Sequence, residues 1–163
     1  MALIGLLSDT HCTFDDKLRS FFEGVDEIWH AGDFGDITVS DTISAIKPLR
    51  GVRGNCDGSA IRLVHPYIQL FELEGLKFLM IHIGGYPGRY DYRALELIHA
   101  HRPDVFICGH SHILKVINDK SLNMTCINPG ASGYQGHQHV RTAIRFRVEN
   151  GALHDMEVGE WSC

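Results

Sequence analysis

The sequence lacks long apolar runs and clusters of basic residues. Its apolar runs are far shorter than the ~20 residues that a membrane-spanning helix needs, so we expect no membrane partner. The formal net charge is -5, and the Lys and Arg residues are scattered along the chain. Proteins that bind a long nucleic acid usually carry a basic stripe, so we also expect no large nucleic-acid surface.

Paired cysteines are missing as well. The five cysteines are odd in number and form no CxxC pair, which argues against a disulfide framework and favours reduced thiols in the cytosol. The segment Met1–Leu7 is apolar, but it has neither a basic start nor a cleavage site of small residues, so we interpret it as a first strand. We therefore expect a cytoplasmic location. A chain of 163 residues is expected to form a single domain, 1–163.

The apolar residues that are present follow strand-like and helical periods in turn. Strands are predicted at Leu3–Leu7, Glu27–His30, Leu49–Val52, Ile68–Glu72, Lys77–Ile81, Val105–Cys108, Ile113–Asn118, Leu122–Ile127, Thr142–Val148 and Leu153–Val158. Helices are predicted from Asp15 or Asp16 to Gly24, at Ser40–Lys47 and at Tyr92–His101. Strands that alternate with helices indicate βαβ units, whereas Glu74-Gly75 and Asn150-Gly151 are typical of hairpin turns. The prediction is an α/β fold with two mixed sheets and a few covering helices.

Polar residues that can bind metal follow five of these apolar runs. Nearly every one has a glycine beside it: the strings are Ser8-Asp9-Thr10-His11, Ala31-Gly32-Asp33, Gly54-Asn55-Cys56-Asp57, His82-Ile83-Gly84 and Gly109-His110-Ser111-His112. Each string alone has a simpler interpretation, such as a helix cap or a polar turn. Ligands of open α/β sheets bind outside the carboxyl ends of the strands, so five such strings on one chain are expected to converge on one site.

Seven side chains in these strings are candidate metal ligands: Asp9, His11, Asp33, Asn55, His82, His110 and His112. They offer three oxygen donors and four imidazoles, which is too many for one tetrahedral ion. Two divalent ions that share a carboxylate fit this set better. A mixture of oxygen and nitrogen donors suits Mn, Fe, Zn, Co or Ni, whereas Ca and Mg prefer all-oxygen shells. Among these five metals we expect Mn.

The ordered set of motifs resembles that of the calcineurin-like metallophosphoesterases. The short chain and the Gly54-Asn55-Cys56-Asp57 string are similar to the small bacterial and archaeal phosphodiesterases of that superfamily, and the resemblance runs from Leu3 to about Gly130. It implies a four-layer fold in which two packed mixed β-sheets, a β-sandwich, are flanked by helices. It also implies that the first ion is held by Asp9, His11 and His112, the second by Asn55, His82 and His110, and both by Asp33.

The implied activity is hydrolysis of a small phosphate ester, a phosphodiester more than a monoester. In that mechanism a hydroxide bridging two ions attacks phosphorus, and no protein nucleophile is needed. Asn55, Cys56 and Asp57 are the candidate catalytic residues. Cys56 departs from the histidine that most of the superfamily has at this position. A thiol is a weak hydrogen-bond donor, so we expect the best activity on esters with good leaving groups.

Other interpretations stay open at this point. A broad-specificity phosphomonoesterase is the alternative within the enzyme class, and a nuclease is disfavoured by the charge balance. A protein-binding scaffold that resembles a retromer subunit is the alternative outside it, although a scaffold has no physical reason to keep four imidazoles at one edge. The sequence is compatible with a homo-oligomer and does not fix the oligomeric state.

The remaining histidines and two arginines receive simpler interpretations. His30 is expected to orient Asp33 or to fill the end of a strand, and His137 and His139 to lie at the surface or at the edge of a substrate site. Surface positions are expected for His65, His99, His101 and His154, and solvated charges for Arg53 and Arg89.

Overall fold

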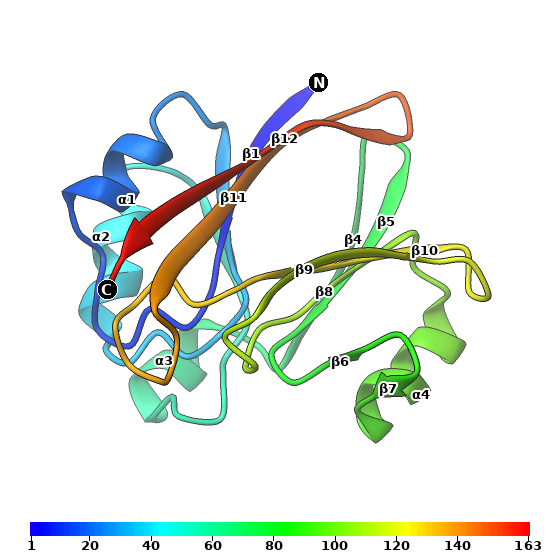
Figure 1. Ribbon diagram of the computed structural model, residues 1–163, viewed down its shortest axis with the longest axis horizontal. Coiled ribbons are helices and arrows are strands. Elements are labelled where there is room, and N and C mark those ends of the chain that lie inside the picture. The colour runs from blue at the N-terminus through cyan, green and yellow to red at the C-terminus, as the bar shows by residue number, and fades with distance from the viewer.

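Two five-stranded sheets pack face to face in the computed structural model, which describes residues 1–163 (Figure 1). The first sheet contains β1 (Ala2–Leu7), β2 (Glu27–His30), β3 (Leu49–Gly51), β11 (Val140–Glu149) and β12 (Ala152–Ser162). The second contains β4 (Ile68–Leu73), β5 (Leu76–Ile81), β8 (Val105–Ile107), β9 (Leu114–Asp119) and β10 (Met124–Pro129).

Both sheets are mixed, as the sequence predicts. The first has the order β12-β11-β1-β2-β3, in which β1, β2 and β3 run parallel and β11 pairs antiparallel with β1 and β12. The second has the order β4-β5-β8-β10-β9, in which β5, β8 and β10 run parallel and β4 and β9 are antiparallel edges. The carboxyl ends of the parallel strands therefore meet at one edge of each sheet.

Strand residues alternate between two apolar layers, because successive side chains of a strand point to opposite faces. Leu6 and Met80 belong to the core between the sheets, with Trp29 at its centre. Their neighbours Leu7 and Ile81 face outward and pack under helices. The result is four layers, helices–sheet–sheet–helix, which confirms the expected fold class.

The helices are short and cover the two outer faces (Figure 1). The first sheet is covered by α1 (Asp16–Phe21), α2 (Ile37–Ser44) and α3 (Ser59–Val64), and the second by α4 (Tyr92–His101). Asp15 caps α1 by accepting the N–H of Leu18, and Asp91 caps α4 in the same way. No helix is both long and apolar enough to cross a lipid bilayer.

Several predicted boundaries are wrong. The helix predicted at Ser40–Lys47 is α2, which begins earlier because Asp36 supplies its N-cap. The first helix stops at Phe21, short of Gly24. Helix α3 and the small hairpin of β6 (Gly85–Tyr86) and β7 (Arg89–Tyr90) were not predicted, since segments this short show no period.

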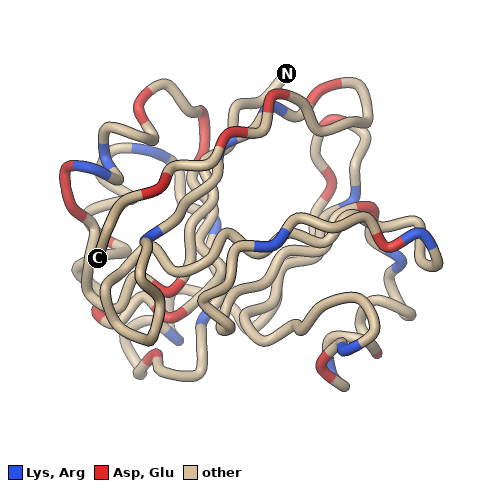
Figure 2. The backbone as a smooth tube through the Cα atoms, in the orientation of Figure 1, with Lys and Arg blue, Asp and Glu red and all other residues tan.

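The hairpin turns are as the sequence predicts. Glu74-Gly75 and Asn150-Gly151 both place two successive residues at positive φ, the geometry of the tight turns that glycine and asparagine favour. Charged residues of both signs are dispersed along the backbone (Figure 2), and β11 carries three arginines, Arg141, Arg145 and Arg147.

Candidate metal centre

The predicted ligands follow strands of both sheets and meet where the two sheets face each other. Asp9 and His11 follow β1, Asp33 follows β2 and Asn55 follows β3 in the first sheet. His82 follows β5 in the second sheet, and His110 and His112 follow β8. The site thus joins the carboxyl ends of five strands, as expected for a ligand site of parallel strands.

Two groups of three side chains have the spacing of a metal site. The ligand atoms of Asp9, His11 and His112 all lie within 4.8 Å of one another, and so do those of Asp33, His82 and His110. A third group with the same spacing joins His11 and Asp33 to Cys56.

Asp33 lies between the two groups. Its Oδ2 is 3.6 Å from Nε2 of His11 in the first group and 3.2 Å from Nε2 of His82 in the second. Oδ1 of Asp9 is 3.2 Å from Nε2 of His112 and 3.8 Å from Nε2 of both His11 and His82. Both carboxylates therefore reach imidazoles of both groups, and the longer of the two contacts is 3.6 Å for Asp33 and 3.8 Å for Asp9.

Three buried polar atoms in this cluster have no hydrogen-bond partner: Oδ1 of Asp9, Nε2 of His11 and Nε2 of His82. Buried polar groups are almost always paired, and leaving one unpaired costs about 1–3 kcal/mol. All three atoms are good metal ligands, and they face one another. The residues present therefore fit divalent cations, which would satisfy all three atoms at once.

The backbone of the cluster is strained. Five of the seven candidate ligands adopt positive φ angles, between 42° for His11 and 71° for His110; the others are Asp9, Asp33 and His112. Such conformations cost of order 1–3 kcal/mol each for residues other than glycine and gather at functional sites. The fold holds these side chains in place at the expense of local stability.

Two glycines beside the ligands make the close approach of the loops possible. A Cβ atom on Gly54 would collide with the carboxylate of Asp33, and one on Gly109 would collide with the hydroxyl of Ser8. A larger residue at either position would push a carboxylate out of the cluster.

The outer oxygen of each carboxylate is fixed by protein donors, which leaves the inner oxygen free. Oδ2 of Asp9 accepts from the Ser8 hydroxyl at 2.6 Å and from the N–H of His110 at 3.0 Å. Oδ1 of Asp33 accepts from the N–H of Cys56 at 2.9 Å. The free oxygens are those that face the imidazoles.

In two of the imidazoles, the Nδ1 nitrogen, which points away from the cluster, lies beside a hydrogen-bond acceptor. This acceptor determines which ring nitrogen carries the proton. Nδ1 of His82 lies 2.7 Å from the carbonyl oxygen of Ala31, and Nδ1 of His112 lies 3.0 Å from Oε1 of Gln138. A carbonyl oxygen only accepts, so Nδ1 carries the proton and the neutral ring turns the lone pair of Nε2 inward. Partners of this kind orient metal-binding histidines.

Charges within the cluster shift several pKa values. Burial opposes ionisation of Asp33, but the contact with His82 and the hydrogen bond from the N–H of Cys56 outweigh it and lower the pKa of Asp33 to about 2. Burial lowers the pKa of His82, yet the contacts with Asp33 and Asp9 raise it overall. The carboxylate of Asp9, 3.2 Å from Nε2, raises the pKa of His112. The carboxylate of Asp33 thus stays charged, and a cationic partner is favoured beside it.

The open side of the cluster holds Asn55, Cys56 and His110, all of which are exposed. Oδ1 of Asn55 lies 3.1 Å from Nδ1 of His110, so the side chains expected to share an ion are in contact. Burial and the nearby charge of Asp33 raise the pKa of Cys56, which keeps the thiol protonated at neutral pH. A substrate can reach the cluster from this side.

Asp57 differs from its expected catalytic role. It is buried, and its two oxygens accept the backbone N–H groups of Asp33, Gly35 and Gly54 at 2.8 to 3.1 Å. Both oxygens are thus occupied by the loops, so we assign Asp57 a positioning role.

Buried histidines support the loop of Asp33 from behind. Nδ1 of His30 accepts the N–H of Gly32, and its Nε2 contacts the Thr10 hydroxyl, in agreement with the expected orienting role. His65 was expected at the surface, but it is buried, and its Nε2 lies 2.8 Å from the hydroxyl of Ser40. Phe34 stacks between the two imidazoles.

The sequence did not single out Gln138, whose contact spans 26 positions to His112. Its neighbours His137 and His139 are exposed, whereas Gln138 is half-buried and donates to the carbonyl oxygens of Gly133 and Gln135. The only signal in the sequence is that it lies in the glycine-rich segment 130–139.

The class of the protein follows from its similarity to a known family. The model of the calcineurin-like phosphoesterase superfamily domain matches residues 2–151. The chain belongs to this superfamily. A probable metallophosphoesterase of Methanocaldococcus jannaschii is 31% identical over 135 residues, which cover 79% of this chain and 67% of that protein.

Solved structures share the fold at lower identity. A novel archaeal phosphodiesterase is 24% identical, with a TM-score of 0.72 over 99% of each chain. Vps29 of Chaetomium thermophilum is 16% identical, with a TM-score of 0.77 over 99% of this chain and 97% of that one. At these identities the likeness establishes the fold alone.

Proposed function

We propose that this protein is a phosphodiesterase that works with two divalent metal ions. The observation that carries the proposal is the arrangement of unpaired buried atoms on Asp9, His11 and His82, which face one another across two groups of ligands. Membership of the phosphoesterase superfamily supports the hydrolysis of a phosphate ester.

The geometry supports the following division of ligands. Asp9, His11 and His112 would hold the first ion, Asn55, His82 and His110 would hold the second, and Asp33 would contribute to both. The nitrogen and oxygen donors favour Mn, and Zn, Fe, Ni or Co are further candidates. When bound, the two ions would supply the Lewis acidity that activates water and neutralises phosphate oxygens.

The protein's own residues position this chemistry. Ser8 and the N–H of His110 hold the Asp9 carboxylate, and the N–H of Cys56 holds that of Asp33. Cys56 lies at the open side of the cluster, grouped with His11 and Asp33. Its protonated thiol donates weakly, which favours substrates whose leaving group needs no strong proton donor.

A diester is favoured over a monoester by two observations. The exposed edge at Asn55, Cys56 and His110 leaves room for a second ester substituent. The archaeal protein that shares the fold is described as a phosphodiesterase. A phosphomonoesterase remains the alternative within the enzyme class.

The scaffold alternative is consistent with the fold that the chain shares with Vps29. A scaffold without metal would keep strained loops and unpaired buried atoms at a stability cost and with no function. The enzyme is therefore the better explanation. The five free cysteines are consistent with a cytosolic location, which we also propose.

The test measures how fast the purified protein hydrolyses bis-p-nitrophenyl phosphate, a diester, and p-nitrophenyl phosphate, a monoester. Each rate is measured on the untreated protein, on the protein after a chelator has removed its metal, and again after Mn is added back. We expect turnover, mainly of the diester, that chelation abolishes and Mn restores. The Asp33→Asn variant should lose this metal-dependent turnover. The Asp36→Asn variant, whose substitution lies at an exposed helix cap, should keep it. Turnover that ignores chelators, or is absent in metal-loaded protein, would refute the proposal.

A further inference from the structure

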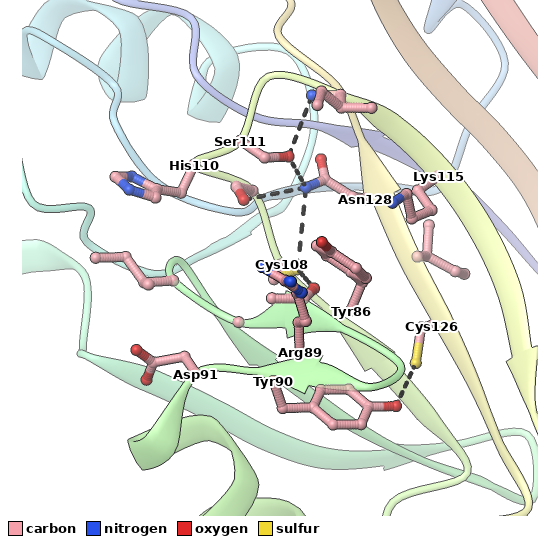
Figure 3. Close-up of a pocket in the computed structure, with 16 residues that line it drawn as sticks. Tyr86, Arg89, Tyr90, Asp91, Cys108, His110, Ser111, Lys115, Cys126 and Asn128 are labelled. Atoms are coloured by element: carbon pink, nitrogen blue, oxygen red, sulfur yellow. Dashed lines mark hydrogen bonds between the residues drawn. The ribbon is translucent and has the colours of Figure 1, made fainter.

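A second cavity of about 240 Å³ lies beside the metal centre (Figure 3). The β6–β7 hairpin, with Tyr86 and Arg89, forms one wall. The loop after β8, with His110 and Ser111, and the strands β9 and β10 form the other. Sites for whole drug-sized ligands are typically ~300–1,000 Å³, so this pocket has the size for one substituent of a ligand.

The pocket and the metal centre share one residue, His110. His110 lines the pocket and also belongs to the ligand group with Asp33 and His82. A molecule whose phosphate lies against His110 would therefore extend one of its groups directly into this space.

Most polar groups in the walls are already bound to the protein. The hydroxyl of Tyr90 donates to Asp119 at 2.6 Å. The amide of Asn128 donates to the carbonyl oxygen of Gly109 and to the hydroxyl of Ser111, both at 3.0 Å. Figure 3 shows the Asn128 amide at the Ser111 hydroxyl, and the Tyr90 hydroxyl at the sulfur of Cys126. Tyr90 and Asn128 are therefore not free to bind a sugar, and the surface left to a ligand combines apolar side chains with Tyr86, Arg89 and Lys115.

Two cations of the wall have no acidic partner. Neither Arg89 nor Lys115 forms an ion pair, and Nζ of Lys115 lies 3.9 Å from the centre of the Tyr86 ring. The nearby carboxylate of Asp91 caps α4. Unpaired cations and a tyrosine favour an aromatic face over an aliphatic chain, and they also favour an anionic ligand.

We propose that this pocket, which we call the aryl pocket, binds an aromatic substituent of the phosphate ester whose phosphate occupies the metal centre. The inference rests on the proposed phosphodiesterase function and narrows its substrates to aryl or heteroaryl esters. Tyr86 and Arg89 are then specificity residues, because they contact the substituent and not the reacting phosphorus.

The test is calorimetric binding of phenylphosphonate and methylphosphonate to the metal-loaded protein. Both probes carry the same anion, so the ratio of their affinities reports the aryl pocket alone. We expect phenylphosphonate to bind about tenfold more tightly. Tyr86→Ala should reduce this ratio about five- to tenfold, with the methylphosphonate affinity unchanged. Tyr92→Ala, an exposed tyrosine outside the pocket, is the matched control and should leave the ratio unaltered.

Arg89→Gln provides a second variant, since Arg89 is exposed and breaks no ion pair when replaced. It should also lower the ratio, by a smaller factor. Equal affinities in the wild type, no binding of phenylphosphonate, or a ratio that neither variant changes would overturn the aryl pocket. If diester hydrolysis remains metal-dependent in that case, the proposed function stands. If diester hydrolysis does not depend on metal, the proposed function itself is refuted.

Discussion

The backbone N–H of Asp33 donates to Oδ2 of Asp57 at 2.9 Å. The same carboxylate also accepts from Gly35 and Gly54, so one buried side chain ties the loop after β2 to the loop after β3. This contact fixes the position of the carboxylate that lies between the two ligand groups.

Asp57→Ala is predicted to destabilise the protein by about 3–5 kcal/mol, because the N–H groups of Asp33, Gly35 and Gly54 lose a charged acceptor. Urea unfolding of the metal-free protein measures this loss. Asp36→Ala, which removes the cap of α2, should cost only ~1 kcal/mol. Equal losses in the two variants would mean that Asp57 is not the tie between the loops.

Gln138→Ala is predicted to weaken metal affinity about tenfold or more, since His112 loses the acceptor that orients its ring. Competition with a fluorescent chelator measures the affinity. Gln135→Ala, an exposed glutamine of the same segment, is the control and should bind metal as the wild type does. Unchanged affinity in Gln138→Ala would show that His112 needs no support or binds no metal.

Cys56→His is predicted to raise the hydrolysis of alkyl esters more than that of nitrophenyl esters. An imidazole is a better proton donor than a thiol, and a positioned general acid contributes roughly 10²–10⁴ in rate where the leaving group is poor. Steady-state rates on a matched alkyl and aryl pair measure the difference. If both substrates change by the same factor, Cys56 does not limit the departure of the leaving group.

The stability of the metal-free protein is predicted to fall as the pH drops below ~6.5. Burial holds the pKa of His30 well below its usual value, so the unfolded chain binds a proton there that the folded protein does not. Stability is lost wherever the unfolded state binds more protons, by up to ~1.4 kcal/mol per pH unit for one group. Burial shifts the pKa of His65 in the same direction.

Urea unfolding at several pH values tests this prediction. His30→Asn should flatten the loss between pH 7 and pH 5, whereas His99→Asn, on the exposed side of α4, should not. The raised pKa values of His82 and His112 make the folded protein more stable as the pH falls, which opposes the effect of His30. Both variants retain His82 and His112, so the comparison between them still reports His30. A slope that is the same in all three proteins would contradict the assignment to His30.

The sequence predicts the meeting of the seven side chains because each follows a strand, and strand order brings the carboxyl ends together. It does not predict the support behind them. The contact of Gln138 with His112 and the burial of His65 depend on loops. The sequences of these loops show no regular spacing of apolar residues. The β6–β7 hairpin, which forms a wall of the aryl pocket, has strands of two residues and therefore leaves no pattern to detect.

The most direct test of the account is the metal content of the protein after it is loaded with Mn and dialysed, determined by elemental analysis per chain. The account predicts two ions for the wild type and for Asp36→Asn, and fewer than two for Asp33→Asn. A wild-type protein that retains no ion, or an Asp33→Asn variant that retains two, would contradict it.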